Sequence, residues 1–141
     1  MKQYIYLGLI LILILAFTII TGCASKNDDE HSKNNSSHGY EQITPDEAKL
    51  LMDSENDFII LDVRTDEEYD TEHIANAILI PDYEIKEKAE SILTDKDQLI
   101  LVYCRSGRRS KNAASTLATL GYTNIKEFGG IIDWKYDTIT K

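Results

Sequence analysis

Cysteine and positive charge are both scarce in this chain of 141 residues. The only cysteines are Cys23 and Cys104. Against 24 Asp and Glu residues stand 15 Lys and Arg residues, which gives a formal net charge of -9. Such an acidic chain is a poor partner for nucleic acid, and anionic lipid would repel its body. The sequence shows no internal repeat, and we expect neither a bound metal nor another cofactor.

A long apolar run dominates the N-terminus. Residues 1–18 combine a short charged start with an apolar stretch from Leu7 to Phe17, which is typical of a secretory signal. The run ends at Thr21-Gly22-Cys23, which resembles the bacterial lipobox. The resemblance implies that residues 1–22 are a lipoprotein signal peptide and that Cys23 is the lipidation site. We therefore expect an extracytoplasmic protein, lipid-anchored to the bacterial cell membrane. The alternative is a transmembrane anchor, since about 18 apolar residues can span a bilayer.

The segment that follows lacks large apolar side chains. From Ala24 to Gly39 it consists mainly of Ser, Asn, Asp, Lys and His. Such a stretch cannot bury enough surface to offset the entropy of ordering, so we predict a disordered tether over residues 23–39. We interpret His31 and His38 within it as solvated linker residues. Residues 40–141 then form one domain of ordinary size.

Helical and extended patterns alternate through this domain. Thr44 and Thr65 each stand three residues before a Glu, which is the capping-box pattern that begins a helix. The apolar runs are short and continuous, as in strands buried on both faces of a sheet. The patterns predict helices over 45–54, 65–69, 83–93 and 110–120, strands over 58–63, 77–80, 99–103 and 125–128, and a short helix near Trp134. We therefore predict an α/β fold, with an open, mostly parallel sheet and helices on both faces.

Cys104 lies where such a sheet places its sites. It ends the apolar run that begins at Leu99, a basic loop containing glycine follows, and Ser110 opens an amphipathic helix. Sites in open α/β sheets lie at the carboxyl ends of strands, and a helix N-terminus there favours an anion. The same surroundings lower the pKa of a thiol, so we expect an exposed, nucleophilic thiolate at Cys104.

Three motifs in this order resemble those of the rhodanese family, and the resemblance covers residues 43–134. They are Leu61-Asp62-Val63-Arg64 with Glu68-Tyr69 and His73-Ile74-Ala75-Asn76-Ala77, then Val102-Tyr103-Cys104-Arg105-Ser106-Gly107-Arg108-Arg109-Ser110, and finally Gly121-Tyr122 with Gly129-Gly130 and Trp134. Two positions depart from the family pattern, because Glu72 and Asn76 stand where glycine is usual. Asn tolerates a left-handed backbone well, so the second departure is mild.

The resemblance implies a sulfurtransferase in which Cys104 carries the transferred sulfur as a persulfide. Phosphatases that share this fold place five residues between their nucleophilic Cys and a phosphate-binding Arg. Here four residues separate Cys104 from Arg109. The tighter loop favours sulfur chemistry over phosphate chemistry. The expected partners are a small anionic sulfur donor such as thiosulfate and an acceptor that is a thiol or cyanide.

The other candidate site residues lie in the loop or beside it. Arg105 and Arg108 suit the anionic oxygens of a donor, since guanidinium pairs well with oxyanions. Arg109 is interpreted either as a substrate contact or as a support for the loop. The substrate-binding set is Arg105, Ser106, Gly107, Arg108 and Arg109, and the structural set next to it is Asp62 and Arg64.

Several residues have expected structural roles. Gly107 should adopt a backbone angle that a side chain would forbid. The hydroxyls of Ser106 and Ser110 are candidate donors to the sulfur or caps for the helix. His73 is expected to be hydrogen-bonded within the fold, and Phe128 and Trp134 are expected in the core.

Two alternative functions remain open at this point. One is a non-catalytic binding module on the same fold, against which the presence of Cys104 counts. The other is an extracytoplasmic thiol-redox protein that forms mixed disulfides through Cys104. No resolving cysteine is present, so a self-contained disulfide cycle is not available to such a protein.

Overall fold

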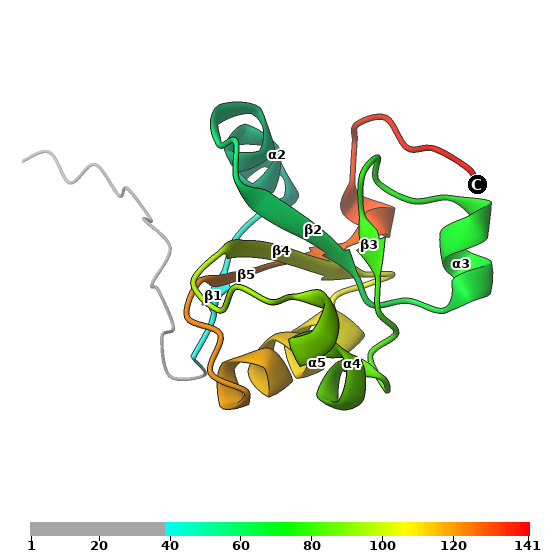
Figure 1. Cartoon of the computed structure of the whole chain (residues 1–141). Coiled ribbons are helices and arrows are strands. Elements are labelled where there is room, and N and C mark those ends of the chain that lie inside the picture. Colours follow the sequence, from blue (N-terminus) through cyan, green and yellow to red (C-terminus); the bar gives the residue numbers. More distant parts are fainter. Residues whose placement is uncertain (1–38) are drawn as a thin grey trace, which may run out of the picture. The chain divides into compact units, whose positions relative to one another are not determined.

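The structure, a computed structural model, describes residues 39–141, and in this part of the chain five parallel strands form one sheet (Figure 1). The strands are β1 (Glu41–Gln42), β2 (Phe58–Asp62), β3 (Ile78–Leu79), β4 (Leu99–Cys104) and β5 (Ile125–Gly130), and they lie in the order β1-β5-β4-β2-β3. Each pairing between neighbours is parallel. The parallel sheet predicted from the sequence is confirmed.

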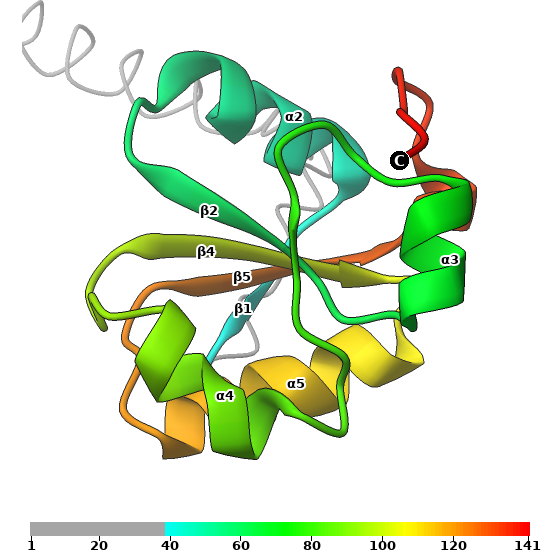
Figure 2. The ribbon, with the colours of Figure 1, turned by 45° about the vertical axis from the view of Figure 1, so that its right-hand side comes forward.

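Helices cover both faces of the sheet. α4 (Ile85–Ile92) and α5 (Arg108–Thr119) lie on one face, and α2 (Pro45–Ser54) lies on the other (Figure 1, Figure 2). α3 (Asp66–Thr71) lies beyond the arrowheads of the central strands, and the 3-10 helix η2 (Ile131–Asp133) directly follows β5. The predicted architecture, with helices on both faces, is confirmed.

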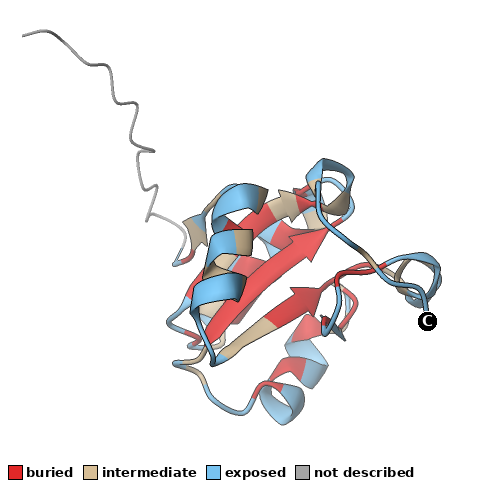
Figure 3. Ribbon diagram, turned by 90° about the horizontal axis from the view of Figure 1, so that it is seen from above, coloured by how far each residue is buried: buried red, intermediate tan, exposed pale blue. Residues whose placement is uncertain are grey.

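The central strand β4 is buried along its whole length. Ile100 and Val102 pack towards α5 in one apolar cluster. Leu101 and Tyr103 point to the opposite face and pack in a second cluster with Phe128. In Figure 3 the strands are mostly buried, whereas the helices carry many exposed residues. Because both faces of β4 are covered, its sequence is continuously apolar rather than alternating.

Capping boxes begin α2 and α3, as the sequence predicts. Thr44 Oγ1 accepts a hydrogen bond from the Glu47 N–H over 3.2 Å, and the Glu47 carboxylate accepts one from the Thr44 N–H over 2.7 Å. Thr65 and Glu68 repeat the arrangement with 3.3 and 3.1 Å. Each box satisfies N–H groups that a helix cannot pair internally. The second box fixes Glu68 at the start of α3.

Several element ends differ from the prediction. α5 begins at Arg108 rather than Ser110, because the chain enters the helix immediately after the turn at Gly107. β1 was not predicted, since two residues are too few to show a pattern and they are held by pairing with β5. The helix predicted over 83–93 is shorter in the structure, where α4 spans Ile85–Ile92.

The predictions for the N-terminus fall outside the described residues. They are the signal peptide over 1–22, lipidation of Cys23, and the tether with its two histidines, and they stay predictions. Within residues 39–141, none of the helices has the length and apolar character that crossing a membrane requires.

Candidate active site

Cys104 ends the central strand β4 just before the loop that leads into α5. Its partner across the sheet is Gly130, and a bulge or irregularity interrupts the pairing between Val102 and Cys104. Bulges at strand ends commonly re-aim a side chain next to a functional site. Cys104 is only 1% exposed, so the expectation of an exposed thiolate is wrong. Cys104 belongs to the buried apolar cluster that packs against α5.

The backbone of this loop turns its N–H groups towards the sulfur. The N–H of Gly107 donates a hydrogen bond to Cys104 Sγ over 3.1 Å. Gly107 has φ of 92°, the left-handed conformation that favours glycine, so this prediction is confirmed. Gly107 is also the N-cap of α5, which places the sulfur near the positive end of a 12-residue helix. The arrangement can stabilise a negative charge on sulfur.

The first half of the loop packs closely against the end of β5. A Cβ atom on Gly130 would overlap the carbonyl oxygen of Arg105 and the Cα of Ser106. The same Arg105 carbonyl accepts a hydrogen bond from the N–H of Ile132 over 3.3 Å. The loop after Cys104 can therefore take this position only because residue 130 is a glycine.

Burial and hydrogen bonding act in opposite directions on the Cys104 thiol. Burial is the largest single effect and raises the pKa, because a buried thiolate loses its hydration. Hydrogen bonds from the Ser110 hydroxyl and from the N–H groups of Ser110, Ser106 and Gly107 lower the pKa. Together they outweigh burial, so the pKa of Cys104 is below its ordinary value. This favours the thiolate, which is the nucleophilic form.

Arg109 is held by an acidic partner from α3. Its Nη1 and Nη2 donate hydrogen bonds to the two carboxylate oxygens of Glu68 over 2.7 and 2.8 Å. These bonds are the main reason that the pKa of Glu68 falls from 4.5 to about 2. Two-point pairing fixes the guanidinium plane and ties α5 to α3. The ion pair fits the loop-support role of Arg109, and its contact with substrate stays a prediction.

Arg105 and Arg108 differ from Arg109 in being exposed. Neither forms a salt bridge within residues 39–141, where the arginine pairs are those of Arg64 and Arg109. A cleft of about 360 Å³ lies beside Arg105, and its lining includes Arg64, Ile131 and acidic residues of α3. The two exposed guanidinium groups are therefore available to an anionic ligand.

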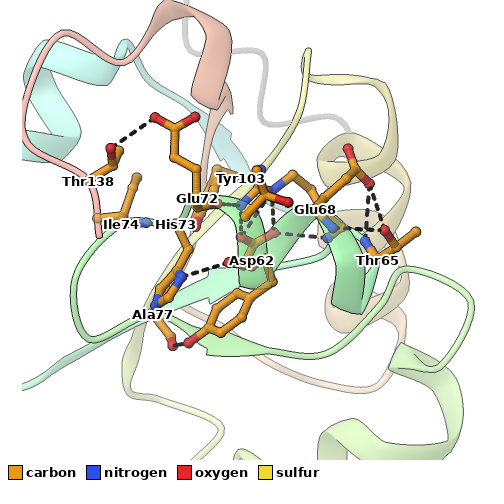
Figure 4. Close-up of polar contacts among 12 residues, drawn as sticks. Asp62, Thr65, Glu68, Glu72, His73, Ile74, Ala77, Tyr103 and Thr138 are labelled. Atoms are coloured by element: carbon orange, nitrogen blue, oxygen red, sulfur yellow. Dashed lines mark hydrogen bonds and ion pairs between the residues drawn. The ribbon is translucent and has the colours of Figure 1, made fainter. Parts of the chain in front are cut away.

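Asp62 and Arg64, expected as structural residues beside the site, form an ion pair. Arg64 Nη2 lies 2.6 Å from Asp62 Oδ2, and Arg64 Nε lies 3.0 Å from both carboxylate oxygens. Both side chains are buried. Arg64 Nη2 also donates to the backbone carbonyl of Glu72 over 2.6 Å. The pair therefore connects the end of β2 to the residue that ends α3, and Figure 4 shows the hydrogen bonds around Asp62.

His73 is a hydrogen-bonded structural residue, as predicted. Its Nδ1 lies 2.7 Å from the carbonyl oxygen of Tyr69 (Figure 4), and the two rings stack with their centroids 3.8 Å apart. The backbone of His73 pairs with Ile139 near the C-terminus. Phe128 is buried in the core, as expected, whereas Trp134 is partly buried and packs against the edge of the same cluster.

A family model described as "Rhodanese-like domain" matches residues 44–137, which is more than half of the chain. The chain belongs to the rhodanese family. The match contains the whole Cys104 loop and both arginine–carboxylate pairs, so the geometry described above is that of a rhodanese domain.

Relatives of this rhodanese domain include two thiosulfate sulfurtransferases. PspE of Escherichia coli (strain K12) is 41% identical over 73 residues, covering 52% of this chain and 70% of PspE. GlpE of Coxiella burnetii is 36% identical over 97 residues, covering 68% of this chain and 88% of GlpE. A solved structure described as a rhodanese with anions from E. coli superimposes with a TM-score of 0.56 and 36% identity. That alignment covers 59% of this chain and 98% of the other.

Both departures from the usual rhodanese pattern fit the backbone. Asn76 has φ of 65°, a left-handed conformation that asparagine tolerates. Glu72 has φ of -166°, which is extended backbone open to any residue. Neither substitution therefore disturbs the turn between α3 and β3.

Glu127 of the rhodanese domain is a buried residue beside the site that the sequence patterns did not predict. This residue of β5 is 2% exposed, and its Oε1 accepts hydrogen bonds from Ser110 Oγ over 2.6 Å and from the Gly129 N–H over 2.9 Å. A signal was present, because Ile125 and Glu127 alternate on one face of a strand and the first is apolar. A charged residue is unusual at such a buried position.

Proposed function

We propose that this rhodanese domain is an enzyme, a sulfurtransferase that moves a sulfane sulfur from thiosulfate or a related donor through a persulfide on Cys104. The observation that carries the proposal is the environment of the Cys104 sulfur. It accepts a hydrogen bond from the Gly107 N–H over 3.1 Å and lies near the N-terminus of α5. Backbone N–H groups and a helix N-terminus stabilise an anion, whether thiolate or persulfide.

The proposed cycle consists of two nucleophilic displacements at sulfur. The Cys104 thiolate attacks the outer sulfur of thiosulfate, a new S–S bond forms, and the S–S bond of the donor breaks. Sulfite leaves with the electron pair, and Cys104 remains as a persulfide. The acceptor, cyanide or a thiol, then attacks the outer sulfur of the persulfide. The electron pair of the broken bond returns to Cys104, which regenerates the thiolate.

The exposed arginines of the loop support an anionic donor. Arg105 and Arg108 bring two positive charges to the mouth of the site in a chain whose net charge is -9. Guanidinium groups pair favourably with sulfur oxyanions for the same geometric reason that they pair with carboxylates. The two relatives named as thiosulfate sulfurtransferases point to the same donor.

The burial of the sulfur disfavours the thiol-redox alternative. A mixed disulfide with a protein partner requires access to the sulfur. Cys104 is 1% exposed. A small donor needs only a narrow approach, and a persulfide extends the reactive sulfur beyond the thiol position. The intact Cys104 loop likewise disfavours a non-catalytic binding module.

The direct test is sulfur transfer from thiosulfate to cyanide by the wild type and by Cys104→Ser. The variant should lose activity, because a serine hydroxyl is a poor nucleophile at neutral pH and cannot hold a persulfide. Circular dichroism should show that its fold survives. Activity in the folded variant within a few-fold of the wild type would contradict the mechanism.

We also propose that the protein is lipid-anchored to the cell membrane through Cys23 and acts outside the cytoplasm. The support is the lipobox-like sequence Thr21-Gly22-Cys23 after an apolar run. Cys23→Ala should leave a precursor that is neither processed nor lipidated, visible as a larger mass in the membrane fraction. If the variant is processed and fractionates like the wild type, the lipoprotein assignment is wrong.

A further inference from the structure

The carboxylate of Glu127 is buried directly behind the catalytic loop. Glu127 is 2% exposed, and within residues 39–141 it forms no salt bridge with a cation. A buried carboxylate without a cationic partner is costly unless hydrogen bonds compensate it. Its compensating donors are the Ser110 hydroxyl and the Gly129 N–H. The fold therefore buries the carboxylate of Glu127, at a cost in free energy, where it contacts the start of α5.

Ser110 has one hydroxyl proton and several acceptors for it. The shortest contact, 2.6 Å, is to Glu127 Oε1, and longer ones lead to the carbonyl oxygens of Gly107 (3.0 Å) and Gly129 (3.3 Å). In the structure the hydroxyl contacts these three oxygens. If it donates to the Cys104 sulfur instead, it lowers the pKa of the thiol. A hydroxyl that donates to Glu127 cannot donate to the sulfur at the same time. The carboxylate and the sulfur therefore compete for a single proton.

We propose that Glu127 is a positioning residue that controls the Cys104 sulfur through the hydroxyl of Ser110. A carboxylate is the strongest acceptor in reach, since charge-assisted hydrogen bonds are stronger than neutral ones. Glu127 therefore draws the hydroxyl away from Cys104 and leaves the backbone N–H groups as the main donors to the sulfur. The proposal rests on the sulfurtransferase function above and adds a control of its nucleophile.

The consequence concerns the reactivity of the thiolate. A thiolate with more hydrogen bonds is more abundant at a given pH, but each molecule of it is a weaker nucleophile. By holding the Ser110 proton, Glu127 keeps the thiolate from being stabilised too far. The hydroxyl can turn to the sulfur when negative charge develops there, for example as the acceptor removes the outer sulfur.

Other charged and titratable groups face this pair from the surrounding elements. They are Arg109 on α5, whose charge interacts with Cys104, Tyr40 before β1, and Glu68 of α3 through its ion pair with Arg109. The pKa of Tyr40 is raised, first by burial and then by the charge of Glu127. All of these groups stay in place in the variants that test the proposal.

The test is a double-mutant cycle on the full chain with Glu127→Gln, Ser110→Ala and both changes together. The rate of alkylation by iodoacetamide is measured against pH, and Cys104 is distinguished from Cys23 by mass spectrometry of its peptide. Glu127→Gln should lower the pKa of Cys104 by about half to one unit, because the released hydroxyl donates to the sulfur. Ser110→Ala should change it little, because in the wild type this hydroxyl already donates to Glu127 and not to the sulfur. In the Ser110→Ala background, Glu127→Gln should change nothing further.

A control and a second variant keep the outcome decisive. Glu55→Gln makes the same charge change at an exposed site before β2, at the opposite end of the strands, and should leave the pKa of Cys104 unchanged. An equal shift by Glu127→Gln in both backgrounds would show a direct effect of charge and overturn the proposal, as would no shift or an upward one. If Glu127→Gln does not fold, Glu127→Asp is the variant to measure. It keeps the negative charge, but its shorter side chain places the carboxylate farther from the Ser110 hydroxyl. This variant should also lower the pKa of Cys104, and an unchanged or raised value would overturn the proposal.

This measurement is independent of sulfur transfer. Alkylation reports the thiol whether or not thiosulfate is a substrate. If the protein has no transferase activity but shows the expected pKa shifts in the double-mutant cycle, only the proposed function is contradicted. If the protein transfers sulfur but lacks the expected pKa shifts in the double-mutant cycle, only the role of Glu127 is contradicted.

Discussion

The arginines around Cys104 form two groups that differ in burial and in partners. Arg64 and Arg109 are paired with carboxylates, and their side chains are 4% and 18% exposed. Arg105 and Arg108 are exposed and have no salt bridge within residues 39–141. The paired arginines therefore hold the elements of the site together, whereas the exposed pair is available to substrate. One residue type serves two purposes, and its surroundings decide which.

Breaking the buried pair should have the largest effect on stability. Arg64→Met keeps the length of the side chain but leaves Asp62 buried without its cation. The free energy of unfolding should fall by about 3–5 kcal/mol, measured by urea denaturation. Lys88→Met, which removes the exposed ion pair with Glu84, is the matched control and should cost about 1 kcal/mol or less. Equal losses in both variants would contradict the structural role of Arg64.

The half-buried pair should give a smaller effect that depends on pH. Since the pKa of Glu68 falls from 4.5 to about 2 on folding, its charge stabilises the protein fully above about 4.5. That stabilisation is lost as the pH falls towards about 2. At neutral pH the wild type should be more stable than Glu68→Gln by about 1–2 kcal/mol, because both side chains are partly exposed. Denaturation at several pH values checks this, and a difference that persists unchanged at the lowest pH would contradict it.

Removing the exposed arginines should change substrate binding and leave stability unchanged. Arg105→Ala with Arg108→Ala should raise KM for thiosulfate about 5- to 30-fold, since each water-accessible contact is worth about 0.5–1 kcal/mol. The effect should shrink at high salt and be smaller for an uncharged persulfide donor. Lys86→Ala on the exposed side of α4 is the control.

Two outcomes would break the comparison between the arginine groups. If the double variant loses the same activity with thiosulfate and with the uncharged persulfide donor, Arg105 and Arg108 hold the loop in shape and do not select the substrate. Unchanged kinetics with both donors would make them bystanders, and the donor would then be supported by the relatives alone.

The last prediction concerns phosphatase activity, which we expect to be negligible. Four residues separate Cys104 from Arg109, one fewer than in phosphatases that share this fold, so we expect the loop to be too tight for a phosphoryl group. An aryl phosphate should therefore show no turnover that depends on Cys104. Inserting one glycine after Gly107 should widen the loop and raise its affinity for phosphate. Robust Cys104-dependent hydrolysis by the unmodified protein would reverse the assignment.

Local patterns explain why much of the fold was predictable. The continuous apolar run that ends at Cys104 indicates a strand buried on both faces, and the boxes at Thr44 and Thr65 mark two helix starts. The positive φ of Gly107 and the pair of Asp62 with Arg64 also follow from short stretches of sequence.

Other features of the site depend on contacts between distant segments. The loop after Cys104 packs closely against Gly130, which no local pattern encodes. Arg109 finds its partner in Glu68, 41 residues away along the chain. The burial of Glu127 depends on α5, which contributes its partner Ser110, whereas a single charged residue in a short strand by itself indicates a solvent-facing position.

The central claim is that Cys104 carries the transferred sulfur, and intact mass spectrometry after incubation with thiosulfate tests it most directly. The account predicts an adduct of about 32 Da, one sulfur atom, that maps to Cys104 and disappears when cyanide is added. Cys104→Ser should show no such adduct. Absence of the adduct on the wild-type protein, or its presence on the variant, would contradict the account.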